Sequence, residues 1–258
     1  LVAELSVPLP PIEVQHRIVN KVNELMNLCD QLENDQERII ETHNTLVTNL
    51  LSVLTSTETD ATKFAETWQI IQTNFDVLFS TESSVEQLKK AILQLAIMGR
   101  LVPQNRTEGS AVEELKLIEN KKALLIKGKQ IKKNKLANPI NPEEEPYSLP
   151  INWQWCRLEQ IGIGSTGKTP KTIERDNFGG DIEFIGPGEI TEAGKILNSQ
   201  KTLTQKGLFK SVEALPQSIL MVCIGGSIGK SAIVQKRIAF NQQINALYPI
   251  DMQAKYIN

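Results

Sequence analysis

The stretch of the sequence that most suggests chemistry is GIGSTGKT, at residues 162–169. It matches the pattern G-x-x-x-x-G-K-[ST], in which backbone N–H groups cradle phosphates and the lysine reaches the β and γ phosphates of a nucleotide. Such a loop must follow a buried strand and open a helix, whose N-terminus helps to bind the phosphates. CRLEQI at residues 156–161 fits a short strand, but Pro170 follows Thr169 and no helical pattern comes after it. A P-loop ATPase is therefore an alternative, not the preferred interpretation.

A second glycine-rich stretch, IGGSIGKS at residues 224–231, has the same ending but lacks the first glycine. The β-prone runs SILMVCIG and KSAIVQ flank it, so we expect it to form the turn of a hairpin. Glycine-rich turns with exposed amides hold a phosphate of a nucleic-acid backbone as readily as that of a nucleotide. We therefore expect backbone phosphates near five residues, which are Lys168, Thr169, Lys171, Ser227 and Lys230.

A cluster of amide side chains, Asn241, Gln242 and Gln243, begins the segment NQQINALYPI. Asn and Gln can make bidentate contacts with adenine in the major groove of DNA. We expect Gln242 and Gln243 to approach bases. The alternative is that these amides hydrogen-bond the backbone of a neighbouring loop.

The elements that must position these residues differ along the chain. Between Ile18 and Val53 the seam positions step by four and three, with only Gln36 and His43 polar, and residues 12–54 contain no Gly or Pro. This pattern predicts a helix of roughly 60 Å with a coiled-coil seam. Because one narrow apolar stripe does not stabilise a lone helix, the helix needs a partner along most of its length. The two polar seam residues are interpreted as packing or register residues.

Residues 55–146 have further helical patterns. One helix is predicted from Phe64 to Leu78, and capping boxes at Ser83 and Ser110 predict the starts of two more. A linker rich in Lys, then Pro, then Glu follows at residues 127–146. Beyond it, frequent glycines and short β-prone runs predict a separate β-rich domain, and an α+β fold class for the chain.

Composition narrows the classes of function. Three separate cysteines (Cys29, Cys156 and Cys223) and two histidines predict free thiols and no metal site. There is no apolar run of 18 residues, so we expect a cytoplasmic protein without a membrane partner. Residues 1–98 carry 6 Lys and Arg against 14 Asp and Glu, whereas residues 150–258 carry 12 against 9. An acidic first part and a basic remainder suggest different partners, although a basic stretch can also be a solvated face.

Taken in order, several segments resemble the specificity subunit of type I restriction–modification systems. The matching segments are VPLPPIEVQHRIVNKVNELMNLCDQLE at 7–33, LKKAILQLAIMGRLVPQ at 88–104, LPINWQWCRLEQIGIGSTGKTPKT at 149–172, GGDIEFIGPGEI at 179–190, and LPQSILMVCIGGSIGKSAIV with FNQQINALYP within 215–249. No single segment is diagnostic, but the combination is specific.

The resemblance implies two target recognition domains, each reading one half of a split DNA sequence. Long helices between them pair antiparallel and dock the modification subunits. Residues 1–10 would then be the tail of a first recognition domain, 11–54 a spacer helix, and 55–146 a helical lead-in with its linker. Residues 147–258 would be a second recognition domain that is incomplete at its C-terminal end. We therefore expect a fragment of a longer chain or an incomplete specificity cassette.

No catalytic residues are expected in this chain, because the sequence has no N-P-P-[FY]-like motif and no Asp/Glu-Lys nuclease constellation. The resemblance implies double-stranded DNA, modification subunits and a restriction subunit as partners. It also implies that S-adenosylmethionine, ATP and Mg²⁺ bind to those partner subunits and that no cofactor binds here. The remaining alternative is a coiled-coil scaffold without a DNA role.

Overall fold

The computed structural model describes residues 6–131 and 138–258, and these form two compact units divided between Gln104 and Asn105. Part of the predicted domain tail at residues 1–10, and the lysine-rich centre of the predicted linker, lie outside the described residues. No helix in the described part of the chain is long and apolar enough to cross a membrane. Nor do His, Cys, Asp and Glu residues there gather into a group that could hold a metal ion.

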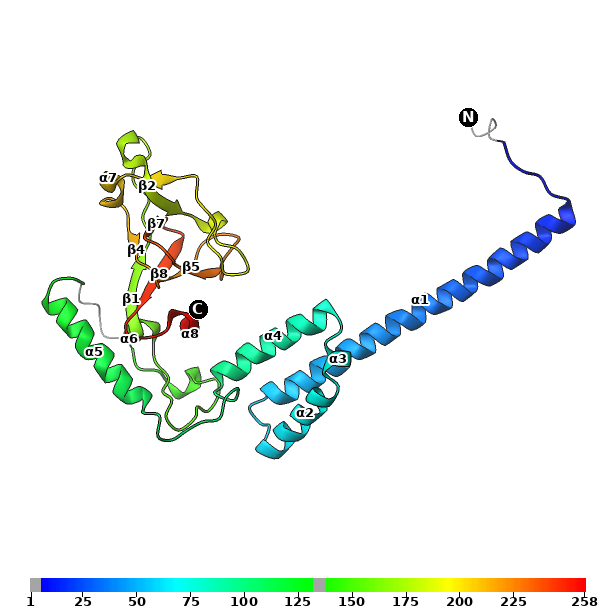
Figure 1. Ribbon diagram of the computed structural model, residues 1–258, viewed down its shortest axis with the longest axis horizontal. Helices are drawn as coiled ribbons and strands as arrows, with labels where there is room; N and C mark the ends of the chain where they lie inside the picture. Colours follow the sequence, from blue (N-terminus) through cyan, green and yellow to red (C-terminus); the bar gives the residue numbers. More distant parts are fainter. Residues whose placement is uncertain (1–5, 132–137) are drawn as a thin grey trace. The chain divides into compact units, whose positions relative to one another are not determined.

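From residue 6 onward, the first unit consists of four helices, which are α1 (Ile12–Thr55), α2 (Ala61–Thr73), α3 (Phe75–Leu78) and α4 (Glu82–Ile97). The long helix predicted from the heptad pattern is confirmed, and Figure 1 shows α1 extending well beyond α2 and α4. Only the C-terminal end of α1 is buried: Val47, Leu51 and Leu54 pack with apolar residues of α2, α3 and α4. The predicted seam lies one position away from this buried face: Leu50 and Val53 are half-buried, and the seam residues from Ile18 to Ile39 are exposed.

Two local predictions in this unit are wrong. The helix predicted from Phe64 to Leu78 is interrupted at Asn74, whose side-chain amide donates a hydrogen bond to the carbonyl oxygen of Ile70. The capping box predicted at Ser83 lies two residues earlier, because the Thr81 hydroxyl accepts from the Ser84 backbone N–H and the Ser84 hydroxyl accepts in return. Short polar side chains that bond to nearby backbone decide both helix ends.

The second unit combines short helices with two four-stranded sheets, which confirms the predicted α+β class. The first sheet is antiparallel, in the order β1 (Gly162–Thr166), β8 (Ile244–Pro249), β5 (Ile219–Val222) and β6 (Ser231–Ile233). The second has the order β3 (Thr202–Leu203), β2 (Phe178–Ile185), β7 (Ile238–Phe240) and β4 (Glu213–Ala214), with β2 parallel to β7. The helical segments are α5 (Ala111–Lys127), η2 (Pro142–Glu144), α6 (Leu158–Ile161), η3 (Arg175–Asn177), η4 (Pro187–Glu189), α7 (Gln205–Leu208) and α8 (Ala254–Ile257).

Apolar burial holds this unit together in three places. The largest cluster joins the two sheets, with Leu220 and Ile244 from the first sheet against Phe240 from the second. A second cluster packs Leu208 of α7 against β2 and β3. A third joins α5 to α6. The unit thus begins at Asn105 and includes α5, so the predicted domain boundary between residues 146 and 147 falls inside it.

Candidate nucleic-acid interface

The GIGSTGKT segment is not a phosphate loop in this structure. Its first five residues form strand β1, paired antiparallel with β8 from Gly162 opposite Pro249 to Thr166 opposite Asn245. The predicted strand at residues 156–161 is wrong, because residues 158–161 form the short helix α6. No helix opens after Thr169, so the geometry needed to bind a nucleotide phosphate is absent from this segment. The ATPase alternative loses its structural basis.

The glycine before Lys168 has a packing role. The N–H of Gly167 donates to the carbonyl oxygen of Ile244, and the N–H of Lys168 donates to that of Phe240, both at 3.0 Å. A Cβ atom added to Gly167 would lie 2.0 Å from the carbonyl oxygen of Asn241. Only glycine therefore lets this backbone lie against the turn between β7 and β8.

The second glycine-rich stretch forms the predicted hairpin turn, between β5 and β6. Met221 pairs with Ser231, and the N–H of Gly229 closes the turn on the carbonyl oxygen of Val222 at 3.0 Å. Gly225 and Gly229 have φ values of +106° and +93°, a conformation that L side chains rarely adopt. The turn therefore needs glycine for its shape, with no phosphate required to explain the motif.

Sheet topology brings three segments to one end of the first sheet. Strands β1 and β5 end there, whereas β8 and β6 begin there, because neighbouring strands in this sheet are antiparallel. Segments 167–171, 223–230 and 241–243 follow or precede those strand ends, and we call them together the candidate interface. They include all seven residues that the sequence predicts to contact DNA. Strands β1, β8 and β5 can be followed in Figure 1.

Side-chain hydrogen bonds connect the parts of the candidate interface. The Thr169 hydroxyl donates to the side-chain oxygen of Gln242 at 2.7 Å. The side-chain amide of Asn241 donates to the side-chain oxygen of Gln243 at 3.0 Å, and the N–H of Gln243 donates back to Asn241. Gln243 is half-buried, and its carbonyl oxygen accepts the N–H of Cys223, so it holds two segments together. Gln242 is exposed.

The three lysines of the candidate interface differ in their surroundings. Lys168 and Lys171 are exposed, and within the described ranges neither forms an ion pair. Lys230 has a side chain only 21% exposed, with its ammonium 3.1 Å from the carboxylate of Glu192. Ser227 is half-buried, and its carbonyl oxygen accepts the N–H of Lys230. Lys168 and Lys171 are thus the more available cations for a phosphate, whereas Lys230 also fixes the glycine turn to the Glu192 loop.

Sequence reasoning missed residues that support the candidate interface from a distance along the chain. The Ser211 hydroxyl donates to the carbonyl oxygen of Lys168 at 2.6 Å, and Glu192 pairs with Lys230. Neither residue belongs to a motif. Their roles depend on loops that approach only in the folded chain, so no spacing in the sequence could reveal them.

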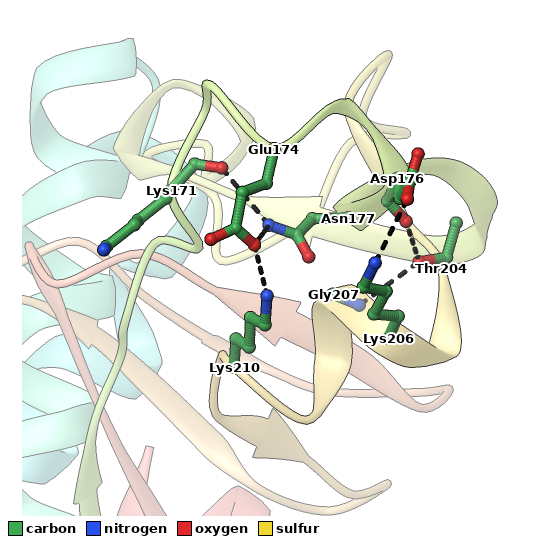
Figure 2. Close-up of polar contacts among 8 residues, drawn as sticks. All are labelled: Lys171, Glu174, Asp176, Asn177, Thr204, Lys206, Gly207 and Lys210. Atoms are coloured by element: carbon green, nitrogen blue, oxygen red, sulfur yellow. Dashed lines mark hydrogen bonds and ion pairs between the residues drawn. The ribbon is translucent and has the colours of Figure 1, made fainter.

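A buried asparagine fixes the segment that follows Thr169. The side-chain nitrogen of Asn177 donates to the carbonyl oxygen of Lys171 and to the carboxylate of Glu174, both at 3.2 Å. Glu174 also pairs with Lys210, just beyond α7 (Figure 2). The hydrogen bonds from Lys210 and then Asn177 lower the pKa of the Glu174 carboxyl, because they stabilise its charged form.

A second set of contacts joins the same two segments. The Thr204 hydroxyl donates to the carbonyl oxygen of Asp176 at 2.7 Å, and the Lys206 ammonium lies 3.1 Å from the Asp176 carboxylate (Figure 2). The N–H of Gly207 donates to the Thr204 hydroxyl. We call residues 171–177 and 204–210, with these contacts, the polar clamp. It ties the segment that carries Lys171 to α7.

Comparison with known proteins agrees with the sequence resemblance. Residues 150–257 match the sequence model of the family described as the type I restriction modification DNA specificity domain. The chain is similar to the specificity subunit of the type I restriction enzyme EcoEI of Escherichia coli, with 44% identity over 262 residues, 98% of this chain and 44% of that protein. It is also similar to the EcoAI specificity subunit of the same species, with 46% identity over 155 residues, 60% of this chain and 26% of that protein.

Among solved structures, the chain is similar to the HsdS subunit of Thermoanaerobacter tengcongensis, with a TM-score of 0.32 and 18% identity over 67% of this chain and 40% of that one. The chain thus spans less than half the length of each of these relatives. Residues 150–257 thus match the type I restriction modification DNA specificity domain, within a chain that is similar to a type I specificity subunit along nearly its whole length.

Proposed function

We propose that this chain recognises one half of a bipartite DNA target within a type I restriction–modification complex, and that residues 147–258 act as its target recognition domain. The observation that carries the proposal is the convergence of three segments at one end of the first sheet. That convergence brings exposed lysines and amides together within the part of the chain that matches the DNA specificity family. The seven residues of the sequence prediction are the proposed DNA contacts.

The chemistry of the candidate interface suits the two tasks that sequence-specific binding requires. Lysines hold phosphates and fix the position of the protein, whereas side chains that reach base edges read the sequence. Lys168 and Lys171 would serve the first task. Gln242 would serve the second, since the bond from Thr169 orients its side chain and leaves its amide hydrogens available for a base.

The helical unit would serve assembly. We infer that α1 acts as a spacer helix, because apolar seam residues such as Leu25 and Leu32 are exposed and fit a partner helix better than water. Modification subunits would dock on this unit. Methyl transfer with S-adenosylmethionine, and ATP- and Mg²⁺-dependent steps, would belong to the modification and restriction subunits. The chain itself would be non-catalytic and would act in the cytoplasm.

The test measures DNA binding by the chain assembled with modification subunits. The DNA target is first selected from a random library. Lys171→Ala should weaken binding to all sequences alike and reduce the slope of log K against log salt by about 1. Gln242→Ala should instead relax the preference at one base position. Lys255→Ala is the matched control, because α8 follows the opposite end of β8.

The outcomes separate the proposal from its rival. If the assembled chain has no salt-dependent affinity for DNA, or if Lys255→Ala matches the two interface variants, the recognition role is wrong. A coiled-coil scaffold would then be favoured, because the exposed apolar seam of α1 would still require a partner helix.

A further inference from the structure

Two apolar side chains near the candidate interface are almost fully exposed. Phe209 is 89% exposed and Ile173 is 87% exposed, which makes them the most exposed large apolar side chains among the residues that the structure describes. Each adjoins one member of an ion pair of the polar clamp, since Ile173 precedes Glu174 and Phe209 precedes Lys210. Large apolar side chains in water, grouped on one surface, mark sites of interaction.

Phe209 projects from a fixed support. Leu208, just before it, is buried against β2 and β3, and the N–H of Phe209 bonds to the carbonyl oxygen of Gln205. A Cβ atom on Gly207 would lie 2.0 Å from the carbonyl oxygen of Asn177, so α7 lies directly on that backbone. The backbone that carries Phe209 is therefore already ordered, so binding costs little backbone entropy at this position.

The charges around Phe209 and Ile173 indicate the kind of partner. Segments 168–177 and 201–211 contain six basic residues, and only two acidic residues, Glu174 and Asp176. Both acids are already paired, with Lys210 and Lys206. The other four basic residues form no ion pair among the described residues, and these are Lys168, Lys171, Arg175 and Lys201. Such a surface attracts a polyanion.

The same surface is continuous with the candidate interface. Ser211, two residues after Phe209, donates its hydroxyl hydrogen bond to the carbonyl oxygen of Lys168. Asn177 of the polar clamp holds the carbonyl oxygen of Lys171. These two hydrogen bonds join the segment with Lys168 and Lys171 to the segments around α7. A polyanion bound at the two lysines would therefore lie close to α7.

We propose that Phe209 and Ile173 form a second, apolar contact with duplex DNA, in which they lie against sugars and base edges next to the bases approached by segment 241–243. This inference rests on the proposed recognition function and adds a contact that no motif in the sequence predicts. The polar clamp positions both side chains. The four unpaired basic residues bring the phosphate backbone to them.

The test measures DNA binding by the chain assembled with modification subunits, over a range of salt concentrations. Phe209→Ala should weaken target binding roughly tenfold or more, which corresponds to the loss of one large apolar side chain from the contact with DNA. Ile173→Ala should weaken binding in the same direction. Because neither side chain is charged, the salt slope should stay unchanged, whereas Lys171→Ala lowers it. Leu215→Ala and Ile151→Ala, also at exposed apolar positions, are the controls and should bind normally.

The possible results distinguish failure of the second contact from failure of the recognition function. If Phe209→Ala binds the target as tightly as the unaltered chain while Lys171→Ala is impaired, the second contact is wrong and the recognition function stands. If Phe209→Ala reduces only assembly with the modification subunits, the apolar pair is a protein interface and this proposal fails. If the unaltered assembly shows no preference among DNA sequences, the recognition function fails and the second contact fails with it.

Discussion

At the scale of single residues, the glycines show how a motif can match in type and spacing yet differ in structure. Gly162 and Gly164 lie in an edge strand, whereas Gly167 allows close approach of two backbones. The lysine and threonine after Gly167 still lie within the candidate interface. What the motif retains is a pair of side chains suited to phosphate binding, presented by a sheet end and not by a helix N-terminus.

Substitution of Gly167 should test the packing role of this glycine. Gly167→Ala forces a methyl group to within 2.0 Å of the Asn241 carbonyl oxygen, so it should lower the free energy of unfolding by about 1–3 kcal/mol. Gly164→Ala is the control, because a Cβ there meets nothing within 4 Å. Urea denaturation measures both. Equal stability of the two variants would contradict the packing role.

At the scale of elements, the long helix and the hairpin turn could be predicted from the sequence. The heptad steps and the absence of Gly and Pro suffice for α1, and the glycine-rich stretch between two β-prone runs suffices for the turn between β5 and β6. The strand β1 could not be predicted, since it consists of GIGST, whose strand character depends on pairing with β8 about 80 residues later. Local propensity is weak wherever tertiary pairing decides.

The candidate interface was predictable only in part, for the same reason. The glycine motifs and the amide cluster identified the three segments, and the hairpin prediction placed one turn. The convergence of the segments required the strand order, and the pairing of Lys230 with Glu192 required a loop contact. Phe209 carries no sequence signal at all, because an exposed phenylalanine and a buried one look the same in a sequence.

The exposed part of α1 should be less stable than its buried end. In the dilute chain alone, amides near Ile18–Ile39 should exchange with solvent much faster than those near Val47–Leu54, because only the latter pack against α2, α3 and α4. Assembly with modification subunits and a complementary helix should slow exchange in the first region. Hydrogen exchange followed by mass spectrometry measures both regions.

Substitutions that place charges on the seam test whether the partner helix binds there. Leu25→Glu together with Leu32→Glu should abolish the gain in protection, whereas Gln31→Glu, at a polar position of the same helix, should leave it intact. If the region around Ile18–Ile39 were already as protected as Val47–Leu54 in the dilute chain, α1 would need no partner and the spacer role would lose its basis.

At the scale of the whole molecule, charge and architecture divide the chain in corresponding ways. The helical unit ends at Gln104, and within it residues 1–98 carry more acidic than basic residues. The unit with the two sheets contains the match to the DNA specificity family, and residues 150–258 carry more basic than acidic residues. This division agrees with the proposed protein-binding role of the first unit and the proposed DNA-binding role of the second.

Exchange of the recognition domain tests the central claim most directly. Residues 147–258 would be replaced by the matching region of the EcoEI specificity subunit, and the resulting chain would be assembled with modification subunits. Methylation of a random DNA library, read by sequencing, gives the target before and after the exchange. We predict that one half of the bipartite site changes, while the other half and the spacing between the halves stay the same. A target left unaltered by the exchange would contradict the assignment of DNA recognition to this domain.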